Sequence, residues 1–316
     1  MNLRRLGNTG LEIAPLVFGG NVFGWTVDQK TGFDLLDRFV DAGFNAIDTA
    51  DVYSTWVEGH TGGESETIIG QWLKANPSKR DRVLIFTKVG GNLGPGRKGL
   101  TERWIMQAAE DSLRRLQIDR IDLYQSHWPD PETPYEETLG AYDKLLRQGK
   151  VRAIGTSNLD AEQLRESLDV AARTGLPRYE TLQPEYNLYD RKKFDGPLRD
   201  LAIKEGLGVI TYYSLASGFL SGKYRSQADL NKSKRGAKMT AYLNERGYLI
   251  LKALDDVSAR HGATPAEVAL AWLMAREGVT APIASATRRS QLDSLIKSVH
   301  LTLPEEDIRE LDGASA

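Results

Sequence analysis

Four polar side chains follow short apolar runs in the sequence, and together they could carry out acid–base chemistry on a carbonyl group. Asp48 falls within NAIDTA, and Tyr53 follows it five residues later. Lys88 ends VLIFTK, and His127 ends IDLYQSH. An ammonium group roughly 4 Å from a phenol, in a medium with an effective dielectric constant of about 20, favours the phenolate by about 4 kcal/mol. We therefore expect Lys88 to lower the pKa of Tyr53 and to make it a better proton donor at neutral pH.

The other two residues have complementary roles in this hypothesis. Asp48 would keep a lysine charged and oriented among apolar walls. His127, as a neutral imidazole, would hydrogen-bond the substrate oxygen or share the proton of Tyr53. Each residue alone also has an ordinary structural interpretation, as a turn cap, a packed aromatic ring, a solvated strand end or a core histidine. The case for chemistry depends on the four side chains lying together.

The elements that must bring these residues together are eight short apolar runs, which alternate with amphipathic stretches of helical length. The runs are residues 15–20, 45–50, 83–88, 121–127, 151–158, 180–186, 208–214 and 281–287. The earlier stretch LRRLGNTGLEIAP is typical of a β-hairpin. Thr101 is a plausible helix N-cap, and Gly43 and Gly149 are plausible helix stops. The alternation predicts an α/β fold, a (β/α)8 TIM barrel that spans residues 1–316 as one domain, and the alternative is a doubly wound open sheet.

A barrel of this kind gathers its functional groups at the C-terminal ends of the strands, and the sequence has polar residues there. Besides the four residues above, the strand ends carry Ser157, Asn158, Gln183, Tyr213, Ser214 and Ser285. Apolar residues precede each of them. We therefore expect one ring of polar side chains at one mouth of the barrel.

Composition and charge limit the classes of function. The 316 residues are 41% hydrophobic and 27% charged, which is typical of soluble globular proteins. Forty-one basic and 43 acidic residues leave a net charge of −2, which argues against nucleic acid or an anionic membrane as a partner. The chain has no cysteine, and its four histidines form no HxH or HxxxH pair, so we expect no metal. The start MNLRRLGNTG lacks the apolar segment of a signal peptide, and we expect a cytoplasmic protein.

Motifs along nearly the whole chain resemble the successive landmarks of the aldo-keto reductase superfamily. They are GFNAIDTADVY, FTK, LYQSHWPD, VRAIGTSN, LQPEYNLYDR, YYSLASGFLSGKY and APIASAT. The resemblance implies a (β/α)8 barrel with a short N-terminal hairpin and extra C-terminal helices, and a catalytic tetrad of Asp48, Tyr53, Lys88 and His127. It also implies NADP(H) extended across the C-terminal mouth, hydride transfer from nicotinamide C4 to the carbonyl carbon, and protonation of the oxygen by the tyrosine. The substrate would be an aldehyde or ketone, with sugars and dicarbonyl compounds among the candidates.

The same resemblance implies a set of cofactor-binding residues. Ser157, Asn158 and Gln183 resemble the residues that hydrogen-bond the nicotinamide carboxamide, and Tyr213 resembles the aromatic residue beneath its ring. The residues around the pyrophosphate would be Ser214, Leu215, Ser217, Gly218 and Lys223. The adenosine end would contact Ser285, Thr287, Arg288, Arg289 and Gln291. An arginine there favours NADPH through the ribose 2′-phosphate, although both arginines also fit the solvated start of a helix. The adenosine end is where the chain departs from the family pattern, because SAT and DSL stand where many members carry GAR and a Glu-Asn pair.

Aromatic residues near the predicted mouth leave the substrate undetermined. Phe23, Trp25, Trp56 and Trp128 would form a wall around a small carbonyl compound, or would serve as loop anchors. Beside the NADPH-dependent reductase, two alternatives remain. One is a regulatory or sensor subunit that binds the nucleotide but turns over slowly, similar to the channel-associated relatives of the family. The other is an NAD-dependent dehydrogenase. The oligomeric state is not indicated.

Two other segments have more than one interpretation. Residues 223–246 are polar, basic and aperiodic, which fits either a lid or a solvated loop. GPGRKG, at residues 94–99, matches the glycine pattern of a dinucleotide-binding turn. The next strand end has no ribose-binding acid, so we interpret this motif as an ordinary loop.

Overall fold

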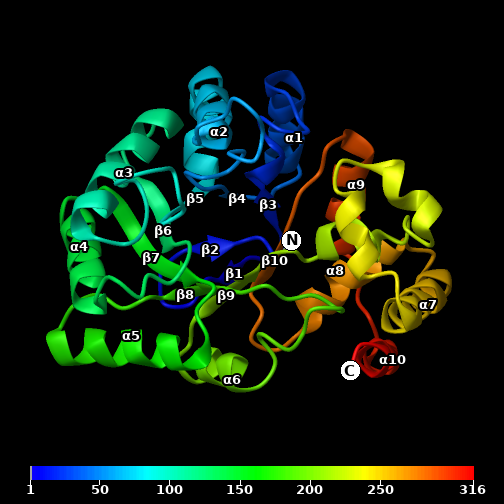
Figure 1. Cartoon of the computed structure of the whole chain (residues 1–316). Coiled ribbons are helices and arrows are strands. Elements are labelled where there is room, and N and C mark those ends of the chain that lie inside the picture. Colours follow the sequence, from blue (N-terminus) through cyan, green and yellow to red (C-terminus); the bar gives the residue numbers. More distant parts are fainter. Residues whose placement is uncertain (1) are drawn as a thin grey trace.

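The computed structural model describes residues 2–316, and its central feature is a closed β-barrel (Figure 1). Within these residues eight parallel strands close in the order β10, β3, β4, β5, β6, β7, β8 and β9. Their bounds are β3 Val17–Gly19, β4 Ala46–Asp48, β5 Leu84–Val89, β6 Ile121–Ser126, β7 Val151–Ser157, β8 Thr181–Gln183, β9 Gly208–Thr211 and β10 Ala281–Ala284. Each strand lies within one of the apolar runs, except that β5 extends one residue beyond its run, to Val89. The predicted barrel is confirmed, and the open-sheet alternative is wrong.

Helices surround this barrel and cover its outer face (Figure 1). One helix follows each strand from β3 to β8: α1 Gln29–Asp41, α2 Glu64–Ala75, α3 Glu102–Leu116, α4 Tyr135–Arg147, α5 Ala161–Thr174 and α6 Pro197–Lys204. The helices later in the chain are α7 Glu245–His261, α8 Pro265–Ala275, α9 Arg289–Ser298 and α10 Glu305–Ala314. Helix α10 packs against α7, beyond the simple strand–helix repeat. The extra C-terminal helices are therefore present.

Local sequence signals set the ends of several helices. The Thr101 side chain accepts a hydrogen bond from the backbone N–H of Trp104, which caps the start of α3. Gly43 and Gly149 follow the last turns of α1 and α4 with φ of 92° and 69°, which favour glycine. All three predicted helix ends are confirmed.

An N-terminal hairpin closes one end of the barrel. Strands β1 (Arg4–Arg5) and β2 (Glu12–Ile13) pair antiparallel, as predicted. Leu6 and Leu11 pack into the apolar barrel interior. Gly208 begins β9, and a Cβ atom there would lie 2.7 Å from the backbone N of Gly7. The hairpin thus covers the N-terminal ends of the strands and leaves the opposite mouth for a site.

The long polar segment 223–246 is folded into short 3-10 turns, η4 (Gln227–Lys232) and η5 (Gly236–Ala241), before α7 begins. The 3-10 helix η3 (Ala216–Ser221) precedes it after β9.

The motif at residues 94–99 lies in an exposed turn between β5 and α3, which supports its interpretation as a loop. No helix in residues 2–316 combines the length and the apolar character that crossing a membrane requires.

Candidate active site

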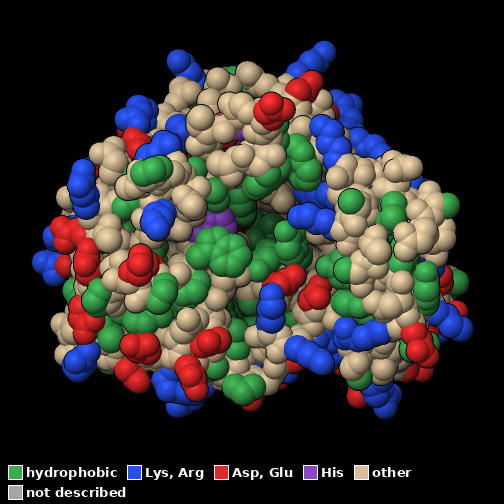
Figure 2. All heavy atoms as spheres, viewed as in Figure 1, with side chains coloured by type: hydrophobic (Ala, Val, Ile, Leu, Met, Phe, Trp, Pro, Cys, Tyr) green, Lys and Arg blue, Asp and Glu red, His purple; other side chains and the backbone are tan. Residues whose placement is uncertain are grey.

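A cavity of about 790 Å³ opens at the C-terminal ends of the strands. In Figure 2, which has the same view as Figure 1, it appears as a hollow at the centre of the face, with hydrophobic side chains and a histidine at its edge. Its lining includes Asp48, Tyr53 and His127 together with residues from β7 to β10. The volume lies in the upper part of the range of roughly 300–1,000 Å³ that is usual for ligand pockets. The polar strand ends therefore meet at one mouth, as the sequence predicts.

Lys88 is the centre of a buried hydrogen-bond network at the base of this cavity. Its Nζ donates to Asp48 Oδ2 at 2.7 Å, to the backbone O of Thr49 at 2.8 Å and to Tyr53 Oη at 2.8 Å. The lysine side chain is 0% exposed and the Asp48 side chain 1%. An ammonium group has three protons to donate, and here each has an acceptor. The network fixes the position of the Tyr53 hydroxyl.

The pKa of Tyr53 moves in the direction opposite to the one predicted. Burial raises it well above its usual range, and the Asp48 carboxylate adds to the effect. Tyr53 Oη donates to Asp48 Oδ2 at 3.2 Å, so the carboxylate stabilises the neutral phenol while Lys88 favours the phenolate. The prediction of a lowered pKa is wrong because it left out desolvation. Tyr53 is consequently a protonated donor at neutral pH.

His127 stands beside Tyr53 at the end of β6. The centroids of the two rings are 5.9 Å apart, and the planes are nearly perpendicular. Burial, and next the positive charge of Lys88, lower the pKa of His127 well below its usual range. The imidazole is therefore neutral at pH 7, and it can donate one hydrogen bond from one ring nitrogen and accept one at the other. Its Nδ1 is buried and finds no hydrogen-bond partner among residues 2–316.

The three residues predicted to hold a carboxamide group lie together at the ends of β7 and β8. Ser157 Oγ donates to the backbone O of Gln183 at 2.7 Å. Asn158 Nδ2 donates to Ser157 Oγ at 3.0 Å and to the backbone O of His127 at 2.8 Å. Gln183 Nε2 donates to Asp48 Oδ1 at 2.9 Å. The carboxamide group of the predicted cofactor would therefore join a network that already connects to the tetrad.

Tyr213 lines the cavity in a backbone conformation that non-glycine residues seldom adopt. Its φ is 52°, and its side chain is 41% exposed. Its backbone O accepts from Nδ2 of the fully buried Asn187 at 3.0 Å. Asn187 Oδ1 in turn accepts from the backbone N–H groups of Tyr189 and Asp190. These hydrogen bonds stabilise the turn and present the ring of Tyr213 to the cavity.

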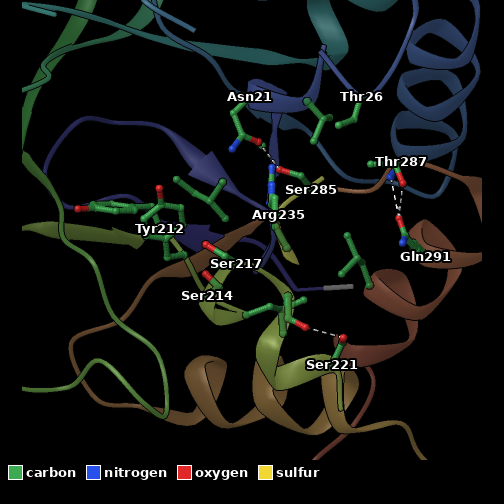
Figure 3. Close-up of a pocket in the computed structure, with 18 of the residues that line it drawn as sticks. Asn21, Thr26, Tyr212, Ser214, Ser217, Ser221, Arg235, Ser285, Thr287 and Gln291 are labelled. Atoms are coloured by element: carbon green, nitrogen blue, oxygen red, sulfur yellow. Dashed lines mark hydrogen bonds between the residues drawn. The ribbon is translucent and has the colours of Figure 1, made fainter. Parts of the chain in front are cut away.

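Most of the other residues predicted to bind the cofactor also line the cavity: Ser214, Leu215, Ser217, Gly218, Lys223, Ser285, Thr287, Arg288 and Gln291. Figure 3 shows the hydrogen bond from Thr287 to Gln291 and the one from Ser285 to Asn21. Arg289 is the exception. Its guanidinium pairs with Asp34 on α1, with 2.6 Å between Nε and Oδ2, and it is not among the lining residues.

The predicted aromatic wall is only partly present. Trp56 and Trp128 line the cavity and are 50% and 49% exposed. Trp25 is not among the lining residues, but its ring packs edge-on against Trp56 with 5.6 Å between centroids. Phe23 belongs to the hydrophobic core, with no exposed surface and a stacked contact to Phe18. The prediction that Phe23 forms part of the substrate wall is therefore wrong.

Sequence reasoning missed several lining residues. Arg235 reaches the cavity from the long segment, where its guanidinium lies 5.1 Å from the Trp25 ring and has no carboxylate partner in the described part of the chain (Figure 3). Burial lowers the pKa of Arg235. Tyr212, Asn21 and Thr26 also line the cavity. The basic composition of residues 223–246 fitted either a lid or a solvated loop, and nothing in it distinguished Arg235.

Comparison with known proteins shows the family of this chain. The model of the Aldo/keto reductase family matches residues 15–316. The chain belongs to the aldo/keto reductase family. As a member of this family it is an oxidoreductase that acts on small carbonyl compounds.

Several curated relatives cover nearly the full length of this aldo/keto reductase. An "Uncharacterized oxidoreductase YrpG" of Bacillus subtilis is 36% identical over 99% of this chain and 95% of the relative. "Aldo-keto reductase YhdN" of the same organism is 30% identical over 99% of this chain and 93% of the relative. A "Probable voltage-gated potassium channel subunit beta" of Arabidopsis thaliana is 33% identical over 95% of this chain and 91% of the relative.

Proposed function

We propose that this protein reduces an aldehyde or ketone to the alcohol with NADPH, and that Asp48, Tyr53, Lys88 and His127 form its catalytic group. The observation that carries the proposal is the Lys88 ammonium group, which is fully buried and bonded to both Asp48 and Tyr53 at the base of an open cavity. Such a network is costly to bury, and it holds one phenol hydroxyl at the point where a substrate oxygen can reach it.

The residues of the cavity fit a phosphorylated dinucleotide. One end holds the hydrogen-bonding groups of Ser157, Asn158 and Gln183. From there the lining continues to Lys223, Lys232, Lys234, Arg235 and Arg288. A guanidinium that is largely buried without a carboxylate partner, like that of Arg235, suits a phosphate group. We therefore assign the polar end to the nicotinamide carboxamide and the cationic side to the phosphates.

When bound in the cavity, NADPH would supply the hydride that reduces the carbonyl carbon. Tyr53 and His127 both line the cavity and their rings are in edge-on contact, with 5.9 Å between centroids, so a substrate oxygen in the cavity can approach both side chains. Tyr53, which burial keeps protonated, donates its proton to that oxygen as negative charge develops. Lys88 stabilises the phenolate left behind, and Asp48 balances the charge of the lysine. His127, held neutral, hydrogen-bonds the same oxygen and orients it.

The first test measures the initial rate of NADPH oxidation with a reactive aromatic aldehyde, for the wild type and for Tyr53→Phe. We expect the variant to lose about 10² or more of the wild-type rate, because it lacks the general acid, and to keep its affinity for NADPH. A parallel assay with NADH measures the preference between the two nucleotides. A Tyr53→Phe variant with the wild-type rate would contradict the assignment of the acid.

A second candidate function is a nucleotide-binding regulatory subunit. One relative is named as a potassium channel subunit beta, and that observation alone favours this candidate. Both functions require nucleotide binding, so turnover separates them. If NADPH binds tightly but the wild type turns over no carbonyl compound in a panel of aldehydes, ketones, sugars and dicarbonyls, the regulatory function becomes the better proposal.

A further inference from the structure

Tyr212 crosses the mouth of the barrel beside the proposed catalytic group. It follows β9 directly, its ring packs against the apolar barrel interior, and it lines the cavity (Figure 3). Its backbone N–H donates to the O of Pro184 at 3.0 Å, and its backbone O accepts from the N–H of Tyr186 at 3.3 Å. These two bonds fix the backbone of Tyr212 to the segment that follows β8, and so they hold the side chain in place.

The hydroxyl of Tyr212 ends at Asn158, with 2.6 Å between Oη and Asn158 Oδ1. At its other end the Asn158 amide donates from Nδ2 to the backbone O of His127 at 2.8 Å. A carbonyl oxygen only accepts hydrogen bonds, so Nδ2 must face His127 and Oδ1 must face Tyr212. Tyr212 is therefore the donor, and the amide is held from both ends.

Asn158 uses both hydrogens of its amide within the protein. Its backbone has a φ of 64°, a left-handed conformation that asparagine adopts more readily than most residues with a side chain. One hydrogen of Nδ2 is used by His127 and the other by Ser157 Oγ at 3.0 Å. The amide oxygen, which can accept a second hydrogen bond, is left for a ligand. That remaining acceptor suits the N–H group of a carboxamide.

We propose that Tyr212 is a positioning residue, whose hydroxyl sets the orientation of the Asn158 amide. Through that amide it increases the affinity of the site for the nicotinamide carboxamide. This inference rests on the proposed function, since it assumes that a nicotinamide nucleotide occupies the cavity. Tyr212 acts through Asn158 and does not take part in the proton transfer. Its effect falls on the nicotinamide half of the nucleotide and not on the adenosine half.

The test compares the dissociation constants of NADPH and of 2′,5′-ADP, which has the adenosine end but no nicotinamide, for the wild type and Tyr212→Phe. The matched control is Tyr186→Phe, which removes a phenol hydroxyl that donates to Asp195 at 2.8 Å and does not line the cavity. We expect Tyr212→Phe to weaken NADPH binding about fivefold to tenfold, as for the loss of one hydrogen bond. We expect 2′,5′-ADP binding to stay within about twofold of the wild type, and Tyr186→Phe to bind both ligands like the wild type.

Asn158→Ala and the double variant provide the second measurement. If Tyr212 acts through Asn158, adding Tyr212→Phe to Asn158→Ala has no further effect on NADPH binding. Fully additive effects, an equal loss for 2′,5′-ADP, or an unchanged affinity of Tyr212→Phe for NADPH would each overturn the inference. Failure of the wild type itself to bind NADPH would overturn the proposed function and this inference with it. The wild-type titration therefore distinguishes a failure of the proposed function from a failure of the Tyr212 inference alone.

Discussion

Removal of the Lys88 charge should destabilise the fold far more than removal of an exposed lysine charge. Lys88 is 0% and Asp48 1% exposed, so Lys88→Met leaves a carboxylate in the barrel with no cation to balance it. Breaking a buried pair from one side typically costs about 3–5 kcal/mol of the free energy of unfolding. The matched control is Lys144→Met, which breaks an ion pair to Glu102 whose side chains are 51% and 42% exposed. It should cost less than about 1 kcal/mol.

The assay is equilibrium unfolding in urea, followed by circular dichroism and by tryptophan fluorescence. The double variant Asp48→Asn/Lys88→Met removes both charges and keeps an amide oxygen for Gln183, so it should recover at least about 2 kcal/mol of the loss. It should nevertheless remain inactive, because the phenolate of Tyr53 has lost its lysine. A Lys88→Met variant that is as stable as Lys144→Met would refute the reasoning, and so would a double variant no more stable than Lys88→Met.

Three further predictions concern other parts of the site. Burial raises the pKa of Asp51 well above its usual range, so the protein loses stability as the pH rises from about 3.9, where the unfolded carboxyl ionises, to the raised pKa of the folded state. Within that window Asp51→Asn should gain up to about 1.4 kcal/mol over the wild type per pH unit, and a variant less stable than the wild type at pH 7 would contradict this. Asn187→Ala removes the side-chain hydrogen bond to the backbone of Tyr213, so it should lower the free energy of unfolding in urea by about 1–3 kcal/mol and weaken NADPH binding. Unchanged stability would show that this hydrogen bond does not stabilise the turn. Arg235→Met should weaken NADPH binding roughly tenfold or more and reduce its salt dependence in titrations, whereas the exposed Arg103→Met on α3 should not.

The barrel and the meeting of its polar strand ends could be predicted from the sequence because both depend on short-range patterns. Apolar runs that alternate with amphipathic segments are typical of strand–helix repeats, and parallel strands all end at the same face. Each of four residues lies within one residue of the end of a strand, so the sequence positions imply their meeting: Asp48, Lys88, His127 and Gln183. The helix ends at Thr101, Gly43 and Gly149 could be predicted for the same reason, because a helix end is a local feature.

Other properties of the site depend on contacts between distant residues. Arg289 turns to Asp34 and leaves the cavity, while Arg235 enters it, and residue type does not separate the two. Phe23 packs into the core although its neighbours approach the mouth, because loop residues have no periodicity that fixes the direction of a side chain. Tyr212 reaches Asn158 across 54 positions of the chain.

The direction of the Tyr53 pKa shift shows the difference most clearly. The sequence determined that a phenol, an ammonium group and a carboxylate would meet at one end of a barrel. Only the tertiary structure decided how deeply they are buried and that Asp48 contacts the phenol as well as the lysine. Desolvation depends on every atom that packs around a group, and these atoms come from many segments of the chain. Local sequence was therefore enough to single out Tyr53 as the proposed acid, whereas packing decided the direction of its pKa shift.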